Sequence, residues 1–291
     1  MKKIVIISTI GLMLLICSFG QPNDNKLVLN NEQDSSQIKL DKREKVRLEK
    51  RRLIEDEDRI DSIRLSTVLD KALIIASRNI DLKTFTIEFE SEIDSIFKVI
   101  TIMKMDTFFS DKYKYLIIHR SSPSLINIDV YIKRDNKFEK VITHEESNLT
   151  YVNDTIQDVN GDGQKDFLVN WYGNNGCCLK NFYIVYLLHA DNGTFSQSYE
   201  FINPTFSAKE KLIRGVRYGQ PGETELYKFR WNGLKVDTVE YIYPDILRKG
   251  HYLKSDRLPY ASKSVKETKI KDVPIEYKNI YGYGWFLGKG L

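Results

Sequence analysis

Five residues that can offer oxygen to a cation recur at alternate positions in one short stretch. They are Asp158, Asn160, Asp162, Gln164 and Asp166. A hard cation such as Ca²⁺ takes several oxygen ligands at once, and alternate residues of a tight loop can point them inward. The Asp and Asn side chains would coordinate the ion, and Gln164 would supply its backbone carbonyl. Carboxylates this close repel one another without a cation. The stretch predicts a calcium site, and the alternative is an Asp/Asn/Gly-rich turn without metal.

The stretches on both sides of this loop predict strands instead of the helices of an EF-hand. Residues 151–156 precede the loop, and an apolar, aromatic run over 166–172 follows it. An EF-hand also needs a bidentate glutamate at the twelfth loop position, where this chain has Val169. Residues 156–170 resemble the FG-GAP/VCBS type of calcium loop, Asp-x-(Asp/Asn)-x-Asp-Gly-x-x-Asp followed by an apolar strand. Residues 84–243 resemble, more diffusely, periplasmic bacterial calcium-loop β proteins, some of which inhibit peptidoglycan hydrolases.

Two adjacent cysteines, Cys177 and Cys178, follow the strand expected over 166–172. Ordinary disulfides join Cα atoms several ångströms apart, so adjacent cysteines can close only a small strained ring. In an oxidising compartment a vicinal disulfide between them would stiffen this loop. Two free thiols and an intermolecular bridge are the alternatives. A zinc site is disfavoured, because adjacent cysteines lack the usual ligand spacing and no histidine cluster accompanies them.

The sequence carries no recognisable catalytic motif. It has four histidines, and no two of them lie at helical ligand spacing. A Gly-x-Ser-x-Gly elbow, a phosphate-binding Gly-Lys-Ser/Thr loop and a His-Glu-x-x-His pair are all absent from it. The two acids of a glycosidase can still lie far apart in sequence. We therefore expect a protein that is not an enzyme, with a secreted hydrolase as an alternative.

The elements that must position these residues are mostly strands. The 291-residue chain contains 17 Tyr and 14 Phe, and aromatic residues favour strands. Alternating runs joined by short turns predict a mainly β fold over 81–243, an antiparallel sandwich or a small propeller. The expected strands are 84–90, 95–103, 113–119, 126–133, 137–143, 151–156, 166–172, 181–189, 194–202, 211–217, 223–231 and 234–243.

The N-terminal part of the chain divides into three segments. Residues 1–20 have a basic start, an apolar middle and a small-x-small end, which predict a signal peptide cleaved before Gln21. A lipoprotein anchored at Cys17 is the alternative. Residues 21–40 are polar without periodicity and predict a disordered linker. Residues 41–80 contain no Gly or Pro and predict one long charged helix. Its end would pack on the β domain, and a partner-binding arm is the alternative.

Residues 244–291 are basic, rich in tyrosine and less regular, and predict an extension packed on the β domain. Within them, Ile280 to Phe286 alternates aromatic residues with glycine. This run predicts a last strand that seals the core, or alternatively a strip that stacks against glycans.

The charge distribution limits the class of partner. The formal net charge is +4, with both signs interspersed, which disfavours a nucleic-acid binder. Three functions stay open. The first is an exported calcium-binding module, for which the resemblance implies an inhibitor or immunity protein of a cell-wall hydrolase. The others are a glycan-binding or adhesion module and a secreted hydrolase. The partner would be a protein or glycan of the cell envelope, and we expect no transmembrane segment in the mature chain.

Overall fold

The computed structural model of the chain describes residues 32–93, 97–173, 176–258 and 266–289. The expected signal peptide, with Cys17, and the expected mature end at Gln21 lie outside the described residues. The chain divides into two units, one ending at Arg59 and the other running from Ile60 to the C-terminus. Every strand of the described chain belongs to the second unit.

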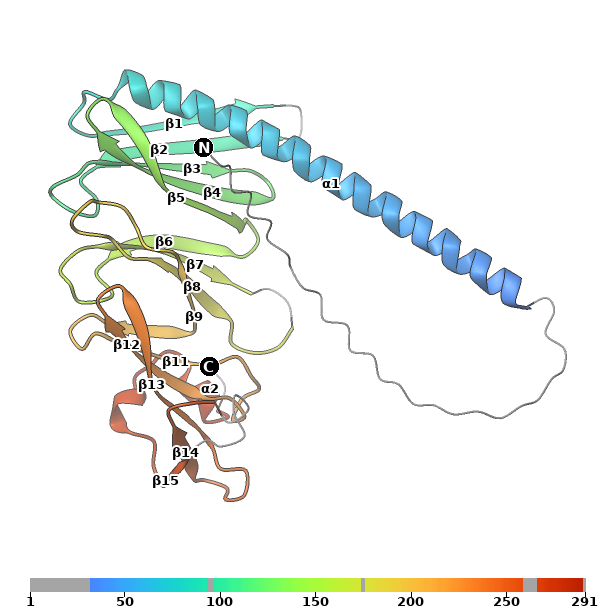
Figure 1. The fold of residues 1–291 in the computed structure, drawn as a ribbon, viewed down its shortest axis with the longest axis vertical. Coiled ribbons are helices and arrows are strands. Elements are labelled where there is room, and N and C mark those ends of the chain that lie inside the picture. Colours follow the sequence, from blue (N-terminus) through green and yellow to red (C-terminus); the bar gives the residue numbers. More distant parts are fainter. Residues whose placement is uncertain (1–31, 94–96, 174–175, 259–265, 290–291) are drawn as a thin grey trace, which may run out of the picture. The chain divides into compact units, whose positions relative to one another are not determined.

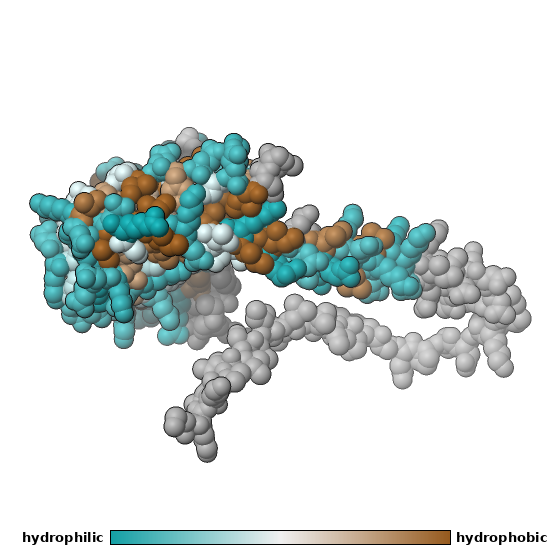
Figure 2. Space-filling view, turned by 90° about the horizontal axis from the view of Figure 1, so that it is seen from above, coloured by the Kyte–Doolittle hydropathy of each residue, from teal (hydrophilic) through white to brown (hydrophobic). Residues whose placement is uncertain are grey.

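One long helix, α1 (Glu32–Arg78), opens the described chain. It begins within residues 21–40, so the prediction of a linker over that whole range is wrong at its C-terminal end. The physical reason is that no glycine or proline interrupts residues 32–78. Before Ile60, the apolar side chains of Val46 and Leu53 stay exposed, and Figure 2 shows apolar patches on the surface of this helix.

Three antiparallel sheets form the β part of the described chain, each a meander of strands consecutive in sequence (Figure 1). The first sheet contains β1 (Phe85–Glu92), β2 (Lys98–Asp106), β3 (Tyr115–Ser121), β4 (Leu125–Arg134) and β5 (Lys137–Ser147). The second contains β6 (Tyr151–Gln157), β7 (Asp166–Tyr172), β8 (Asn181–Tyr186) and β9 (Tyr199–Ile202). The third contains β10 (Pro204–Ser207), β11 (Leu212–Val216), β12 (Leu226–Asn232), β13 (Lys235–Pro244), β14 (Tyr252–Ser255) and β15 (Thr268–Ile270). The prediction of a mainly β fold with one long N-terminal helix is confirmed.

The last turns of α1 pack against one face of the first sheet. Ala72 and Ala76 are fully buried there, in a cluster that contains Met103, Leu116 and Ile118 of the sheet. Alanine has no side chain beyond Cβ, so it lets the helix approach the strands closely. The amphipathic end of the helix therefore covers this face of the sheet.

The strand β7 lies between two apolar layers. Its residues Phe167 and Val169 pack in a cluster with Ile128 of β4, and Leu168 packs in another with Ile213 of β11. Successive side chains of a strand point to opposite faces, so β7 contributes to both layers. This explains why Phe167, Leu168 and Val169 are apolar in succession instead of alternating with polar residues. A loop that ends at the start of β7 is therefore anchored on a buried strand.

The aromatic–glycine run near the C-terminus forms a turn and a short helix, α2 (Tyr283–Phe286), where we expected a strand. It follows a short 3-10 helix, η1 (Ile275–Tyr277). Gly282 has a φ of 80° and leads into α2, and a left-handed backbone there breaks any extended run. Ile280 and Phe286 are buried against the third sheet, so the run does seal the core.

Candidate functional site

The predicted calcium loop connects β6 to β7 at one end of the second sheet. Gln157 and Asp166 face each other as the pair that closes this hairpin. Val159 is buried in the core between the second and third sheets, and Asn160 is also buried. The first residues of the loop therefore pack against the core, while Asp162 and Gly163 are exposed to solvent.

Asp166 fixes the base of the loop. One carboxylate oxygen accepts a hydrogen bond from the Val159 N–H at 3.1 Å, and the other accepts one from the Leu188 N–H at 3.0 Å. Burial raises the pKa of Asp166 to about 7; the two N–H groups oppose that rise, and the nearby carboxylates Asp162 and Asp158 add to it. The ionised form of this side chain would be favoured by a neighbouring positive charge.

The other acidic side chains fold over the backbone of their own loop. The Asp158 carboxylate accepts hydrogen bonds from the N–H groups of Gly161 and Gly163, at 2.7 and 2.9 Å. One Asp162 oxygen accepts the Gln164 N–H at 2.8 Å. The Asp162 contact is an Asx turn, in which a side chain accepts from the backbone two residues on. Together with the two longer-range Asp158 contacts, it holds the loop in one shape through side chain to backbone hydrogen bonds.

Two glycines give the loop its curvature. Gly161 has a φ of 73° and Gly163 a φ of 85°, both in the left-handed region that favours glycine. They differ in their surroundings, because a Cβ on Gly161 would overlap the carbonyl oxygen of Ala208, while nothing lies near that position at Gly163.

The donor set of the loop fits a hard cation. Every proposed ligand offers oxygen, and a carboxylate oxygen has lone pairs beyond the one used in a single hydrogen bond. Across the described ranges, no three His, Cys, Asp or Glu side chains come together as a metal-binding group. A cation here would thus need the Asn160 side chain and the Gln164 carbonyl in addition to Asp158, Asp162 and Asp166.

The outer side of the loop forms one wall of a pocket of about 420 Å³. Loop residues Gly163, Gln164 and Lys165 face residues 107–112, which connect β2 to β3. The Lys165 N–H donates to the Phe109 carbonyl at 3.3 Å, and so joins the two walls. Whatever fixes the loop therefore also fixes this pocket, which sequence reasoning did not find.

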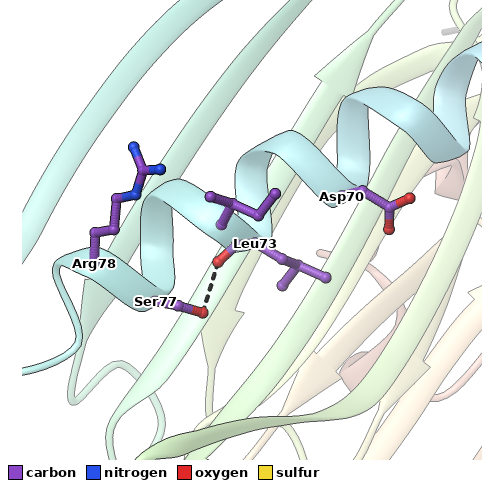
Figure 3. A pocket seen from close by; sticks show the side chains of 5 residues that line it. Asp70, Leu73, Ser77 and Arg78 are labelled. Carbon is purple, nitrogen blue, oxygen red and sulfur yellow. Dashed lines mark hydrogen bonds between the residues drawn. The ribbon is translucent and has the colours of Figure 1, made fainter.

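A larger and more open depression, of about 610 Å³, lies along the last turns of α1 (Figure 3). It is lined by Asp70, Leu73, Ile74, Ser77 and Arg78. The Ser77 hydroxyl donates to the Leu73 carbonyl of the same helix at 2.7 Å. An activated serine would instead be hydrogen-bonded to a general base. Neither histidine nor cysteine lines this depression.

Cys177 and Cys178 lie in the connection between β7 and β8, and both are free thiols in the structure. Cys177 is exposed and Cys178 is half-buried. The vicinal disulfide expected in an oxidising compartment is therefore not formed here and stays a prediction.

A group of titratable side chains lies where the first and second sheets meet. The Nδ1 atom of His144 lies 3.0 Å from the Tyr186 hydroxyl, and His119 Nε2 lies 3.7 Å from an Asp154 oxygen. Burial lowers the pKa of both histidines. At His144, the negative charges of Glu146, Asp154 and Glu145 raise the pKa and partly offset burial. At His119, Asp154 raises the pKa, while Lys104 lowers it further.

We expect His119 and His144 to lower the stability of the folded protein as the pH falls from 7 to 5, against an opposite contribution from Asp166, whose raised pKa makes the folded state bind the extra proton. Histidine in an unfolded chain protonates near its usual pKa of about 6.5, whereas His119 and His144 resist protonation in the fold. The unfolded state then binds more protons, so the loss begins near the unfolded pKa and ends once the folded histidines also protonate. Urea unfolding at pH 7, 6 and 5 measures it. Because Asp166 is present in both proteins, the difference between the wild type and the double variant His119→Gln/His144→Gln reports the histidines alone. The wild type should become less stable relative to the variant as the pH falls, and an unchanged difference would refute this origin.

Comparison of the chain with known protein families, curated proteins and solved structures found no match. The structure itself defines the class, a mainly β protein with three antiparallel sheets and a long N-terminal helix. No helix in the described part of the chain is long and apolar enough to cross a membrane.

Proposed function

We propose that this protein is an exported, calcium-stabilised binding protein without catalytic activity, and that the ion is held by the loop 158–166. The observation that carries the proposal is the buried Asp166 carboxylate at the base of an all-oxygen loop. Asp158, Asn160, Asp162 and Asp166 would coordinate through side chains, and Gln164 through its carbonyl. When bound, the ion would supply positive charge at this cluster of carboxylates.

The role proposed for the ion is structural. All its ligands come from one hairpin loop, and the residues that line the adjoining pocket include no histidine or cysteine. Fixing the loop fixes the pocket wall formed by Gly163 to Lys165. The facing wall carries Phe108, Asp111 and Lys112, a mixture of apolar and charged groups suited to a macromolecular surface. We place the partner contact at this pocket.

The partner class follows from the resemblance to periplasmic calcium-loop β proteins. A cell-wall hydrolase is the first candidate, and its inhibition is the activity to measure. A glycan-binding strip at the C-terminus has less support. Ile280 and Phe286 are packed against the third sheet, and the Trp285 Nε1–H already donates to the Gly219 carbonyl at 2.9 Å.

Chelation should lower the melting temperature of the wild-type protein, and calcium should restore it better than magnesium. A ligand that binds only the folded state stabilises it by about 2.7 kcal/mol at a hundredfold excess over its dissociation constant. Magnesium is less effective because it demands tight octahedral geometry and gives up water reluctantly. Asp162→Ala should remove most of the calcium response. Asp191→Ala, in another exposed turn, is the matched control and should keep it.

The inhibitor proposal is tested with purified peptidoglycan hydrolases and the wild-type protein in calcium. Peptidoglycan breakdown should slow in proportion to added protein. Lys112→Glu should weaken the inhibition while leaving calcium stabilisation unchanged. If no hydrolase is inhibited and the protein itself degrades peptidoglycan, the alternative of a secreted hydrolase replaces this function.

A further inference from the structure

Two thiols, an amide, an ammonium group and a phenol meet where two loops approach each other. Cys177 and Cys178 belong to the β7–β8 connection, and Tyr218 and Gln220 belong to the β11–β12 connection. The Gln220 side chain donates from Nε2 to Cys177 Sγ across 2.9 Å. The ammonium nitrogen of Lys180 lies 5.3 Å from the centre of the Tyr218 ring. This group of side chains plays no part in the proposed calcium site.

Lys180 is held against the loop that carries the exposed thiol. Lys180 is 8% exposed, and its stem lies against the loop backbone, since a Cβ added at Gly173 would come within 2.8 Å of its Cδ. Its Nζ would lie 3.2 Å from a Cβ added at Gly176, the residue before Cys177. A positive charge therefore stays close to a cysteine that solvent can reach.

The two thiols have different characters. A hydrogen bond with the Cys178 thiol lowers the pKa of Cys177, and Gln220 and Lys180 contribute to the same shift. The pKa of Cys178 is raised, chiefly by its hydrogen bond with Cys177. Because the thiolate is the nucleophile, Cys177 is suited to attack first, and Cys178 is placed to react second.

We propose that Cys177 and Cys178 form a thiol–disulfide exchange site for low-molecular-weight disulfides. The Cys177 thiolate attacks one sulfur of a disulfide RSSR, whose S–S bond breaks as one RS⁻ leaves. Cys178 then loses its proton to solvent and attacks Cys177 Sγ in the mixed disulfide, displacing the second RS⁻. The two cysteines lose two electrons and two protons in total, and RSSR becomes two RSH. The product is a Cys177–Cys178 disulfide, and a reducing thiol reverses the steps.

The resulting bond would be easily reduced. Adjacent Cα atoms are about 3.8 Å apart across a trans peptide, which is shorter than the usual separation of bridged cysteines. Strained and exposed disulfides are the labile ones. Cys178 also has a φ of 86°, a left-handed conformation that a non-glycine residue adopts only when its surroundings hold it there. This site is thus suited to reversible exchange instead of permanent crosslinking.

The test uses the full chain with Cys17→Ser, so that only two of its three cysteines remain. The reduced protein is incubated with oxidised glutathione, and its intact mass is followed with time. We expect a product lighter by about 2 Da, the mass of two hydrogens, with no retained glutathione and no dimer. Cys178→Ser should stop at one glutathione adduct on Cys177. Cys177→Ser should react about tenfold more slowly than Cys178→Ser.

The surrounding side chains provide a second readout. Gln220→Ala and Lys180→Met should each slow the first step about threefold or more, because both groups favour the thiolate. Thr224→Ser, in the same connection as Gln220, is the control and should leave the rate unchanged. Two stable adducts on the wild-type chain, equal rates for the two serine variants, or no reaction with glutathione would each overturn the proposal.

Discussion

Asp129→Ala should destabilise the folded protein by about 3–5 kcal/mol, because it leaves a buried arginine without its counterion. The Asp129 and Arg120 side chains are 1% and 6% exposed, and their closest N and O atoms are 2.6 Å apart. Arg120 also donates to the Leu65 carbonyl of α1 at 2.6 Å. The pair therefore joins the helix to the first sheet, and its loss affects both.

Urea unfolding at neutral pH measures this effect. The matched control is Glu139→Ala, which breaks the more exposed ion pair with Arg134 and should cost less than about 1 kcal/mol. The double variant Arg120→Met/Asp129→Ala should recover much of the loss, since it removes the uncompensated charge as well. Equal losses for Asp129→Ala and Glu139→Ala would show that the buried pair contributes no more to the free energy of unfolding than the exposed pair.

Gly161→Ala should cost about 3 kcal/mol, whereas Gly163→Ala in the same loop should cost about 1 kcal/mol. Both substitutions force a left-handed backbone on alanine, with φ of 73° and 85°. Only at Gly161 would the new Cβ also overlap the Ala208 carbonyl oxygen, which belongs to the backbone and cannot rotate away.

Thermal and urea unfolding of the two alanine variants, each in calcium and in chelator, separates the cost of the left-handed backbone from the cost of the overlap with Ala208. The difference between the variants should persist in chelator, because the overlap with Ala208 does not depend on an ion. A Gly161→Ala protein as stable as Gly163→Ala would mean that the loop can move away from Ala208 at no cost.

Local sequence patterns predicted the elements whose shape depends on local residues. The alternation in β1 and the Asn232-Gly233 turn between β12 and β13 predicted strands and a hairpin that the structure contains. The position of the loop 158–166 between two strands was also predicted. By contrast, β10, β14 and β15 have only three or four residues each, and pairing with a neighbouring strand defines them. Strands this short contain too few residues to show an alternating hydrophobic pattern, so the sequence does not reveal them.

The features that depend on distant parts of the chain could not be predicted. Residues 107–112 reach the loop 158–166 only because the first and second sheets pack together. Gln220 lies 43 residues from Cys177 in sequence, so no motif could link them. The pairing of Asp129 with Arg120 depends on the register of β3 and β4. Tertiary packing determines all three.

Calorimetric titration of Ca²⁺ into the purified chain, previously dialysed against chelator, is the most direct test of the calcium site in the loop 158–166. We predict one binding event in the wild-type protein, weaker binding of Mg²⁺, and no event in Asp162→Ala that has kept its secondary structure. No detectable calcium binding by the wild-type chain, together with the same melting temperature in chelator and in millimolar-range calcium, would contradict it.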